Sequence, residues 1–373
     1  MGAGARQLLG VCVALAVAAC DTDNPTPRDG SVLPVGAGGD AQVVSPVRDA
    51  GQEPSAGDAA AVAPSERDAN VSSEVDAGVE SEDAGVEPAP APSGPGSWTS
   101  GATMPTARTE LAVALLDGVV YVAGGYGGYA SFEAYDIARD SWRGLRDLPA
   151  PMEHPSLCTV AGKVYLTGGN AAALFVYDPA SDSWADRKPM LYARYAAAAV
   201  ALDGQMYVVG GTGPEGRVMQ RYDPVSDSWV TRAPLSIVRD HLAAVVLAGR
   251  IYALGGRPGV GDVYDSVEIY DPERDSWSPG PSLNEGRSGF AAAVVGGRIY
   301  AAGGEVLQFP FFVRDTAEEL DPQTGTARPL SPLPTPLHGI GAVGTGGRMY
   351  VFGGASRPAA SSPRLGGVHI FTP

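Results

Sequence analysis

Cysteine, histidine and basic residues are scarce in this sequence, and long apolar runs are absent. Only three cysteines and four histidines occur among 373 residues. The main apolar run, from Leu8 to Ala19, is too short to cross a bilayer stably. Lysine and arginine number 26 against 42 acidic residues, for a formal net charge of −16. This acidity disfavours nucleic-acid binding.

Residues 1–19 read as a targeting segment. Arg6 precedes the apolar run, and Val17-Ala18-Ala19-Cys20 resembles a bacterial lipobox. The resemblance implies cleavage before Cys20 and lipid attachment to its thiol, which would anchor the protein in the bacterial membrane. The alternative is an ordinary secretory signal peptide with a cysteine placed there by chance. We expect a lipoprotein of the cell envelope, extracytoplasmic, with the choice of membrane and leaflet left open.

Processing of this kind leaves no pair of cysteines. Cys12 departs with the leader and Cys20 carries lipid, so Cys158 has no partner for an intrachain disulfide. Because Cys158 lies in a run of small apolar residues, we expect a buried, unreactive thiol and not a catalytic one.

Residues 20–95 have the composition of a disordered linker. They are rich in alanine, glycine, proline, serine, valine and acidic residues, and residues 21–95 contain no aromatic side chain. Such a segment buries too little apolar surface to order itself. Most of the acidic excess of the chain lies here, so the remainder is only mildly negative.

Residues 96–373 repeat one pattern with a period of roughly 45 residues. Each repeat holds a run of small residues, a turn, an apolar run and a glycine pair, and most continue with Tyr-Asp and Trp. The glycine pairs begin at Gly124, Gly168, Gly210, Gly255, Gly303 and Gly353. Strand-length runs at this period indicate a supersecondary unit of four antiparallel strands.

These motifs resemble the Kelch repeats of β-propellers. The resemblance implies an all-β, six-bladed propeller with four antiparallel strands in each blade. The chain ends on Val368-His369-Ile370-Phe371-Thr372-Pro373 without the expected Ser-Trp, which stands instead at Ser97-Trp98. We therefore expect the N-terminal strand to complete the sixth blade and close the ring.

One position in the repeat concentrates charge. Aligned on the turn glycines, it holds arginine in four blades: Arg108, Arg194, Arg239 and Arg287. By resemblance to other Kelch propellers, we expect these arginines to line the channel mouth and grip an anionic ligand. The alternative is a structural role, in which each arginine bonds carbonyls of the neighbouring blade.

Further candidate ligand-binding residues lie close to that position. Two residues later come Glu110, His154 and His241, which are acid–base candidates. Blades 2 and 4 are not adjacent, so we expect no shared metal site and no cofactor. The loop after Gly304 carries Glu305 and Phe309 within a phenylalanine-rich stretch, which indicates an exposed contact surface.

Two functions fit this sequence. We favour a non-catalytic, monomeric binding module that recognises an extracytoplasmic protein, peptide or glycan, because no complete catalytic set is visible. The alternative is a carbohydrate-active enzyme similar to the Kelch-type sialic-acid mutarotases. A buried carboxylate facing an arginine at the channel mouth would favour the enzyme.

Overall fold

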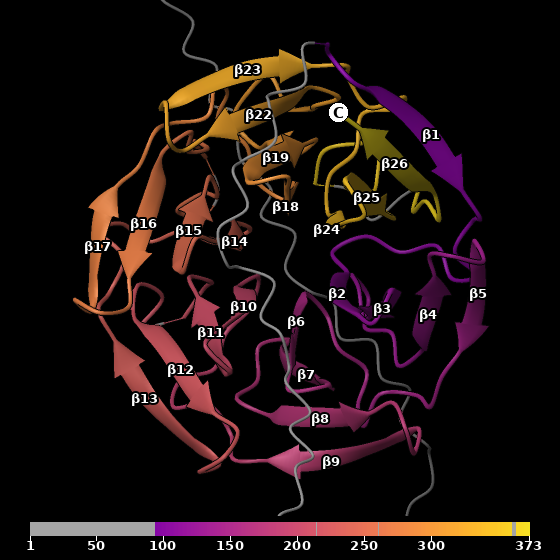
Figure 1. Ribbon diagram of the computed structural model, residues 1–373, viewed down its shortest axis with the longest axis vertical. Coiled ribbons are helices and arrows are strands. Elements are labelled where there is room, and N and C mark those ends of the chain that lie inside the picture. Colours follow the sequence, from indigo (N-terminus) through magenta and orange to yellow (C-terminus); the bar gives the residue numbers. More distant parts are fainter. Residues whose placement is uncertain (1–93, 214, 260, 360–362) are drawn as a thin grey trace, which may run out of the picture. The chain divides into compact units, whose positions relative to one another are not determined.

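The computed structural model describes residues 94–213, 215–259, 261–359 and 363–373. The predicted leader (1–19) and nearly all of the predicted linker (20–95) lie outside these residues. The described chain forms six four-stranded antiparallel sheets arranged around a central axis, which confirms the six-bladed propeller (Figure 1). Within the described residues no helix is long and apolar enough to cross a membrane.

The first three blades are built from consecutive strands, with the innermost strand first. Blade 1 comprises β2 (Ala112–Leu116), β3 (Val119–Ala123), β4 (Phe132–Asp136) and β5 (Ser141–Gly144). Blade 2 comprises β6 (Pro155–Val160), β7 (Lys163–Gly168), β8 (Leu174–Asp178) and β9 (Ser183–Arg187). Blade 3 comprises β10 (Ala198–Leu202), β11 (Gln205–Val209), β12 (Met219–Asp223) and β13 (Ser228–Arg232).

The remaining blades include one insertion and one strand from the N-terminal side. Blade 4 comprises β14 (Ala243–Leu247), β15 (Arg250–Leu254), β16 (Val267–Asp271) and β17 (Ser276–Pro279). Blade 5 comprises β18 (Ala291–Val295), β19 (Arg298–Ala302), β22 (Ala317–Asp321) and β23 (Thr326–Leu330), with the hairpin β20 (Glu305–Val306) and β21 (Phe312–Val313) inserted. Blade 6 comprises β24 (Gly341–Thr345), β25 (Arg348–Phe352), β26 (Val368–Thr372) and β1 (Ser97–Gly101).

Ring closure occurs as the sequence predicts. Strand β1 pairs antiparallel with β26, and Trp98 stands opposite Phe371, with ring centroids 4.9 Å apart. Nε1 of Trp98 also donates a 2.8 Å hydrogen bond to the carbonyl of Ser331, which follows the outer strand of blade 5. The first described strand therefore closes blade 6 and ties it to its neighbour, so no open sheet edge is left between the two ends of the ring.

Two-residue turns join the first and second strands of the blades. At Asp117-Gly118, for example, both residues have positive φ, 50° and 74°, as a type I′ hairpin turn requires. The hydrophobic core lies between neighbouring blades: Tyr121 of blade 1 packs with Leu166 and Tyr177 of blade 2. The six inner strands carry mostly small residues because little room remains around the axis.

Candidate functional site

One end of the channel is closed by a ring of six equivalent residues, one from each blade. All six have positive φ, between 48° and 62°: Glu110, His154, Ala196, His241, Gly289 and Gly339. Main-chain hydrogen bonds run around part of this ring, from the amide of Glu110 to the carbonyl of Gly339 (2.7 Å) and from Gly339 to Gly289 (2.6 Å). The left-handed backbone suits glycine and strains other residues.

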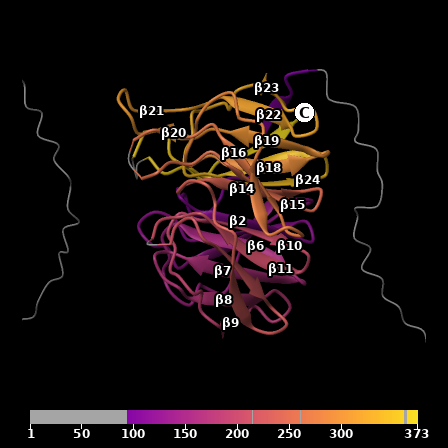
Figure 2. The ribbon, with the colours of Figure 1, turned by 90° about the vertical axis from the view of Figure 1, so that its left-hand side faces the viewer.

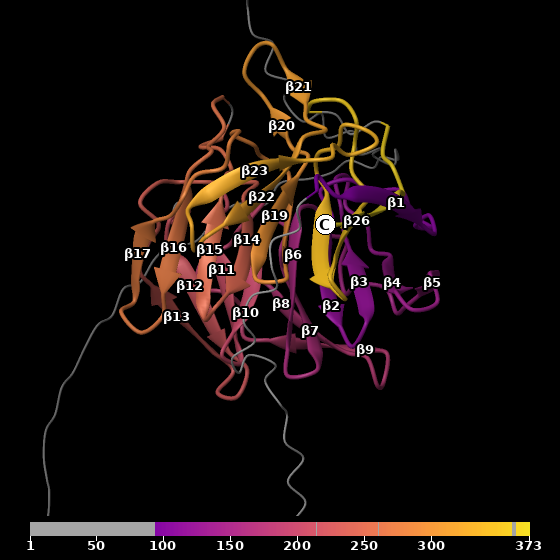
Figure 3. The same cartoon turned by 45° about the horizontal axis from the view of Figure 1, so that its top comes forward.

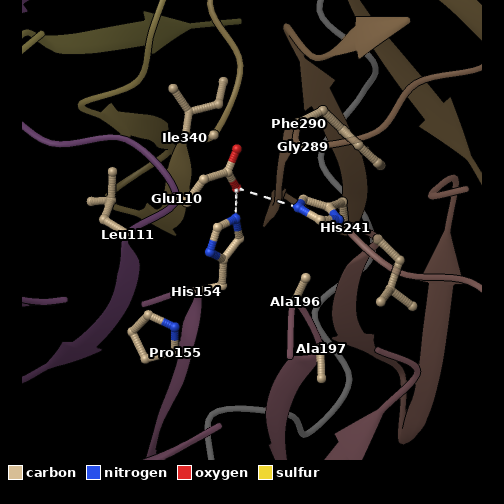
Figure 4. Close-up of a pocket in the computed structure, with 12 residues that line it drawn as sticks. Glu110, Leu111, His154, Pro155, Ala196, Ala197, His241, Gly289, Phe290 and Ile340 are labelled. Carbon is tan, nitrogen blue, oxygen red and sulfur yellow. Dashed lines mark ion pairs between the residues drawn. The ribbon is translucent and has the colours of Figure 1, made fainter. Parts of the chain in front are cut away.

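The polar members of this ring meet at the axis. Nε2 of His154 lies 3.7 Å from Oε2 of Glu110, and Nε2 of His241 lies 4.0 Å from the same oxygen (Figure 4). The two imidazole rings are 5.2 Å apart between centroids. The expectation of no shared metal rested on blades 2 and 4 not being adjacent, but these contacts show that side chains of non-adjacent blades meet at the axis.

A second layer surrounds Glu110. Nδ1 of His338 lies 3.5 Å from Oε1 of Glu110 and 3.3 Å from Oε2 of Glu305. The guanidinium of Arg257 forms a buried ion pair with Glu305 (2.8 Å) and a second with Asp240 (3.2 Å). Asp240 in turn bonds Nδ1 of the neighbouring His241 at 2.6 Å.

These contacts shift the pKa values of several groups. Burial alone would raise the pKa of Glu110, but His338, His241 and His154 outweigh it and hold that pKa well below its usual range. Burial lowers the pKa of His154 to about 4, and Glu110 only partly opposes this. For His338, burial lowers the pKa, but Glu110 and Glu305 more than compensate, so the pKa is raised. The cluster thus holds two histidines, His154 and His338, whose pKa values are shifted in opposite directions.

A pocket opens above this cluster. It has a volume of about 220 Å³, and its lining includes the polar cluster just described together with Tyr126, Tyr195 and Leu307. The β20–β21 hairpin stands out from the blades beside it (Figures 2 and 3). Phe309 at its tip is 86% exposed, and Phe311 and Phe312 are also exposed, as expected for a contact surface.

The four arginines do not line this pocket, which corrects the expectation drawn from the sequence. Arg108, Arg194, Arg239 and Arg287 have no exposed surface. Arg287 donates to the carbonyls of Gly303 (2.8 Å) and Thr316 (3.0 Å) and pairs with Glu318 (2.7 Å).

Arg108 and Arg239 make equivalent bonds, to Glu133 and Glu268, whereas Arg194 bonds only carbonyls. The partners lie within the same blade, so the alternative of guanidinium bonds to the neighbouring blade is also incorrect. A buried guanidinium requires such partners. Neighbouring blades are joined instead by main-chain bonds, for example from the Gly256 amide to the Arg287 carbonyl (2.9 Å).

Three residues of this cluster were not identified from the sequence. His338 occupies the position between the arginine and the axis ring in blade 6, and Asp240 occupies it in blade 4. Arg257 follows the glycine pair of blade 4, as Glu305 follows that of blade 5. An alignment of the residues that follow the glycine pairs places Arg257 and Glu305 at the same position in adjacent blades. The sequence could therefore have predicted this pair.

The thiol of Cys158 is buried, as predicted. It lies in β6, and burial raises its pKa to about 12. A thiol of this kind is protonated at neutral pH and is a poor nucleophile.

Fold and repeats define the class: an all-β, six-bladed propeller that contains Kelch repeats. The family model described as Kelch motif matches residues 107–149, 193–236 and 239–284. The solved structure of YjhT superimposes with a TM-score of 0.64 at 14% identity, covering 73% of this chain and 96% of that one. At this identity the likeness shows the fold alone.

Curated relatives share only part of their length with this chain. Kelch repeat and BTB domain-containing protein 12 of Danio rerio is 32% identical over 100 residues, which cover 23% of this chain and 16% of the relative. Kelch-like protein 35 of Mus musculus is 29% identical over 124 residues, covering 31% and 22% respectively. The chain thus spans less than a quarter of either relative.

Proposed function

We propose that this protein is a binding module that takes the end of a glycan into the pocket at the channel end. The observation that carries the proposal is a polar pocket floored by Glu110 and histidines and walled by Tyr126 and Tyr195. Carboxylates and imidazoles form hydrogen bonds with sugar hydroxyls, and tyrosine rings pack against the apolar face of a sugar ring. A few convergent polar groups in a concave site are typical of small-ligand sites.

Charge in the pocket favours a neutral glycan over an anionic one. Two carboxylates, those of Glu110 and Glu305, line it together with one guanidinium, that of Arg257, which pairs with Glu305. The argument for an anionic ligand rested on the arginine ring, which is buried and bonded within the blades. An anion entering this pocket would therefore find no excess of positive charge.

The β20–β21 hairpin supports a role in recognition. Phe309, Phe311 and Phe312 are exposed beside the pocket, and exposed aromatic residues are frequent anchors in protein interfaces. We propose that the hairpin contacts the protein or polymer that carries the glycan. The glycan end then occupies the pocket while its carrier packs on the aromatic surface.

Glycan and peptide arrays probed with the purified protein test this proposal. Binding to a set of glycans should fall at least about tenfold in Tyr126→Ala, the loss of one ring contact. Tyr192→Ala is the matched control, because Tyr192 is similarly exposed (38% against 41%) but lies outside the pocket. Binding to peptides alone, or equal losses in both variants, would contradict the proposal.

A second function has one specific observation in its favour. The buried Arg257–Glu305 pair is the carboxylate facing an arginine that the sequence analysis associated with a sugar-handling enzyme. Glu110 could accept a proton and His338, whose pKa is raised, could donate one in opening a sugar ring. If so, NMR exchange spectroscopy should show faster interconversion of the ring forms of a sugar or sugar acid with the protein than without it. Glu110→Gln should abolish the acceleration.

We also propose that lipid on Cys20 anchors the protein in the cell envelope. The proposal is supported by the lipobox-like Val17-Ala18-Ala19-Cys20 and rests on residues outside those that the structure describes. Mass spectrometry of the protein from bacterial membranes should find Cys20 as the first residue, carrying acyl chains. An unmodified N-terminus beyond Asp21 would contradict it.

A further inference from the structure

We infer that Glu110, His154 and His241 bind one divalent transition-metal ion, such as Zn²⁺, at the end of the channel. The three side chains come from three blades and point at one another (Figure 4). One carboxylate oxygen and one ring nitrogen of each histidine lie within 4.8 Å of one another. This inference goes beyond the proposed glycan binding and reverses the expectation, drawn from blade order, that no metal is shared.

The separations suit a metal after a small contraction. Ligands about 2.0–2.1 Å from a tetrahedral zinc ion are about 3.3–3.4 Å from one another. The two Nε2 atoms lie 3.7 and 4.0 Å from Oε2 of Glu110, so movements of a few tenths of an ångström bring them into range. Two histidines and one carboxylate bind zinc with a position left open for water or another ligand.

The partners of His241 hold it in the form that binds metal. Asp240 accepts a hydrogen bond from Nδ1 at 2.6 Å, which leaves Nε2 as the unprotonated nitrogen facing Glu110. A carboxylate on the far nitrogen of a metal-binding histidine is a common supporting contact. Arg257 lies 3.2 and 3.3 Å from the two ring nitrogens, so it rests against the ring face. The lone pair of Nε2, which lies in the ring plane, stays open.

The nitrogen of His154 that faces Glu110 is only weakly bonded. Its Nε2 has a long contact of 3.4 Å with the Tyr195 hydroxyl, and its 3.7 Å separation from Oε2 of Glu110 is too long for a hydrogen bond. Buried polar groups are normally satisfied. A metal ion on Nε2 would replace the weak tyrosine contact with a strong bond.

Charge also favours a cation at this point. The carboxylates of Glu110, Asp240 and Glu305 lie around the histidines with one guanidinium, that of Arg257, among them, so the cluster holds an excess of negative charge. A divalent ion balances that excess.

His338 lies beside the other carboxylate oxygen of Glu110. Nε2 of His338 donates to the carbonyl of Arg357 at 2.8 Å, and its Nδ1 lies between Oε1 of Glu110 and Oε2 of Glu305. We therefore place the ion on Oε2 of Glu110, between His154 and His241.

The backbone conformation of the three proposed ligands also supports a metal site. The axis-ring position has φ of 60° and 62° in blades 5 and 6, where glycine occupies it, and φ of 56°, 48° and 49° at Glu110, His154 and His241. Three long polar side chains thus occupy a left-handed position that two blades give to glycine. Strain of this sort is concentrated at functional sites.

Isothermal titration of chelator-stripped protein with Zn²⁺ alone tests the inference. We expect one ion per chain with micromolar or tighter affinity. His154→Asn and His241→Asn should weaken binding at least about 100-fold, and Asp240→Asn, which only positions His241, should weaken it about 10–100-fold. Asparagine is chosen because it tolerates positive φ. His369→Gln, which changes a histidine in β26, the third strand of blade 6, should bind as the wild type does.

A second readout separates metal loss from unfolding. Co²⁺ in place of Zn²⁺ should give visible absorption bands that disappear in His241→Asn, while the circular dichroism of that variant keeps the wild-type sheet signal. No Zn²⁺ binding up to millimolar concentration, or binding that survives both histidine changes, would overturn the inference. Glycan arrays run in chelator test the proposed function separately, so either result can fail without the other.

Discussion

Two rings of residues, two positions apart in the same segment of each blade, have opposite roles. The arginine ring, with Arg287 as an example, is buried inside the blades and bonded to carbonyls and a glutamate of its own blade. The axis ring, with Glu110, His154 and His241, turns to the centre, where side chains of different blades meet. Equivalent positions in a propeller come together only at the axis.

The difference has a physical cause in the backbone. Positive φ at the axis ring turns its side chains into the channel end, where they meet side chains of other blades. Each arginine, by contrast, reaches along its blade to the first glycine of the pair, as Arg239 does to the carbonyl of Gly255 at 2.7 Å. Charge in the first ring is therefore bonded within single blades, whereas charge in the second lies at the channel end among side chains of other blades.

The largest effect that separates the two rings is expected from Arg287→Ala. It leaves Glu318 buried without its partner and should cost about 3–5 kcal/mol of unfolding free energy. Chemical denaturation measures the loss. Zn²⁺ affinity of the folded variant should be unchanged, because blade 5 contributes no proposed ligand.

Arg274→Ala is the control for that change. Arg274 also pairs with a carboxylate, Asp271, but its side chain is 71% exposed, so its loss should cost no more than about 1 kcal/mol. Equal costs for the two variants would contradict a structural role for the arginine ring.

The propeller itself could be predicted from the sequence because its signals are local and repeated six times. The glycine pairs identify the blades and the strand order. The last repeat lacks its tryptophan, and Trp98 at the other end of the repeats shows how the ring closes. The predicted contact surface around Phe309 is likewise exposed. These features depend on the period and on the residues next to a turn.

The candidate site could be predicted only in part, because it depends on side-chain direction. Glu110, His154, His241 and Glu305 were identified, but periodicity does not reveal that three of them meet across the axis. The partners of the arginines were missed for the same reason: Glu318 lies in the third strand, some thirty residues away, and only the fold brings it near Arg287.

A smaller effect concerns pH and the axis ring. The pKa of His154 is about 4 in the folded protein, against about 6.5 unfolded, so the unfolded chain binds the extra proton as pH falls between these values. Stability should therefore fall by about 2–3 kcal/mol from pH 6.5 to pH 4. His154→Asn should remove that part of the loss, measured by denaturation in chelator at both pH values.

His338 serves as the opposite control for that experiment. Its pKa is raised, so its contribution is complete below pH 6.5 and is lost as pH rises through the folded value. His338→Gln should then lower stability at acidic and neutral pH while leaving the His154-dependent loss between pH 6.5 and 4 in place. An unchanged acid sensitivity in His154→Asn would show that another group dominates it.

The smallest effect tests the backbone of the axis ring alone. A Cβ added at Gly289 would have the main-chain nitrogen of Gly339, 3.4 Å away, as its nearest neighbour, so Gly289→Ala meets no clash and pays only for φ of 60°. It should cost about 1 kcal/mol. Ala196→Gly, at φ of 53°, should change stability by less, because relief of strain is offset by the greater freedom of glycine when unfolded. Thermal melting of both variants measures these costs. A loss well above 2 kcal/mol for Gly289→Ala would mean that packing holds the ring in place. The polar members of the ring would then not adopt this backbone conformation at modest cost.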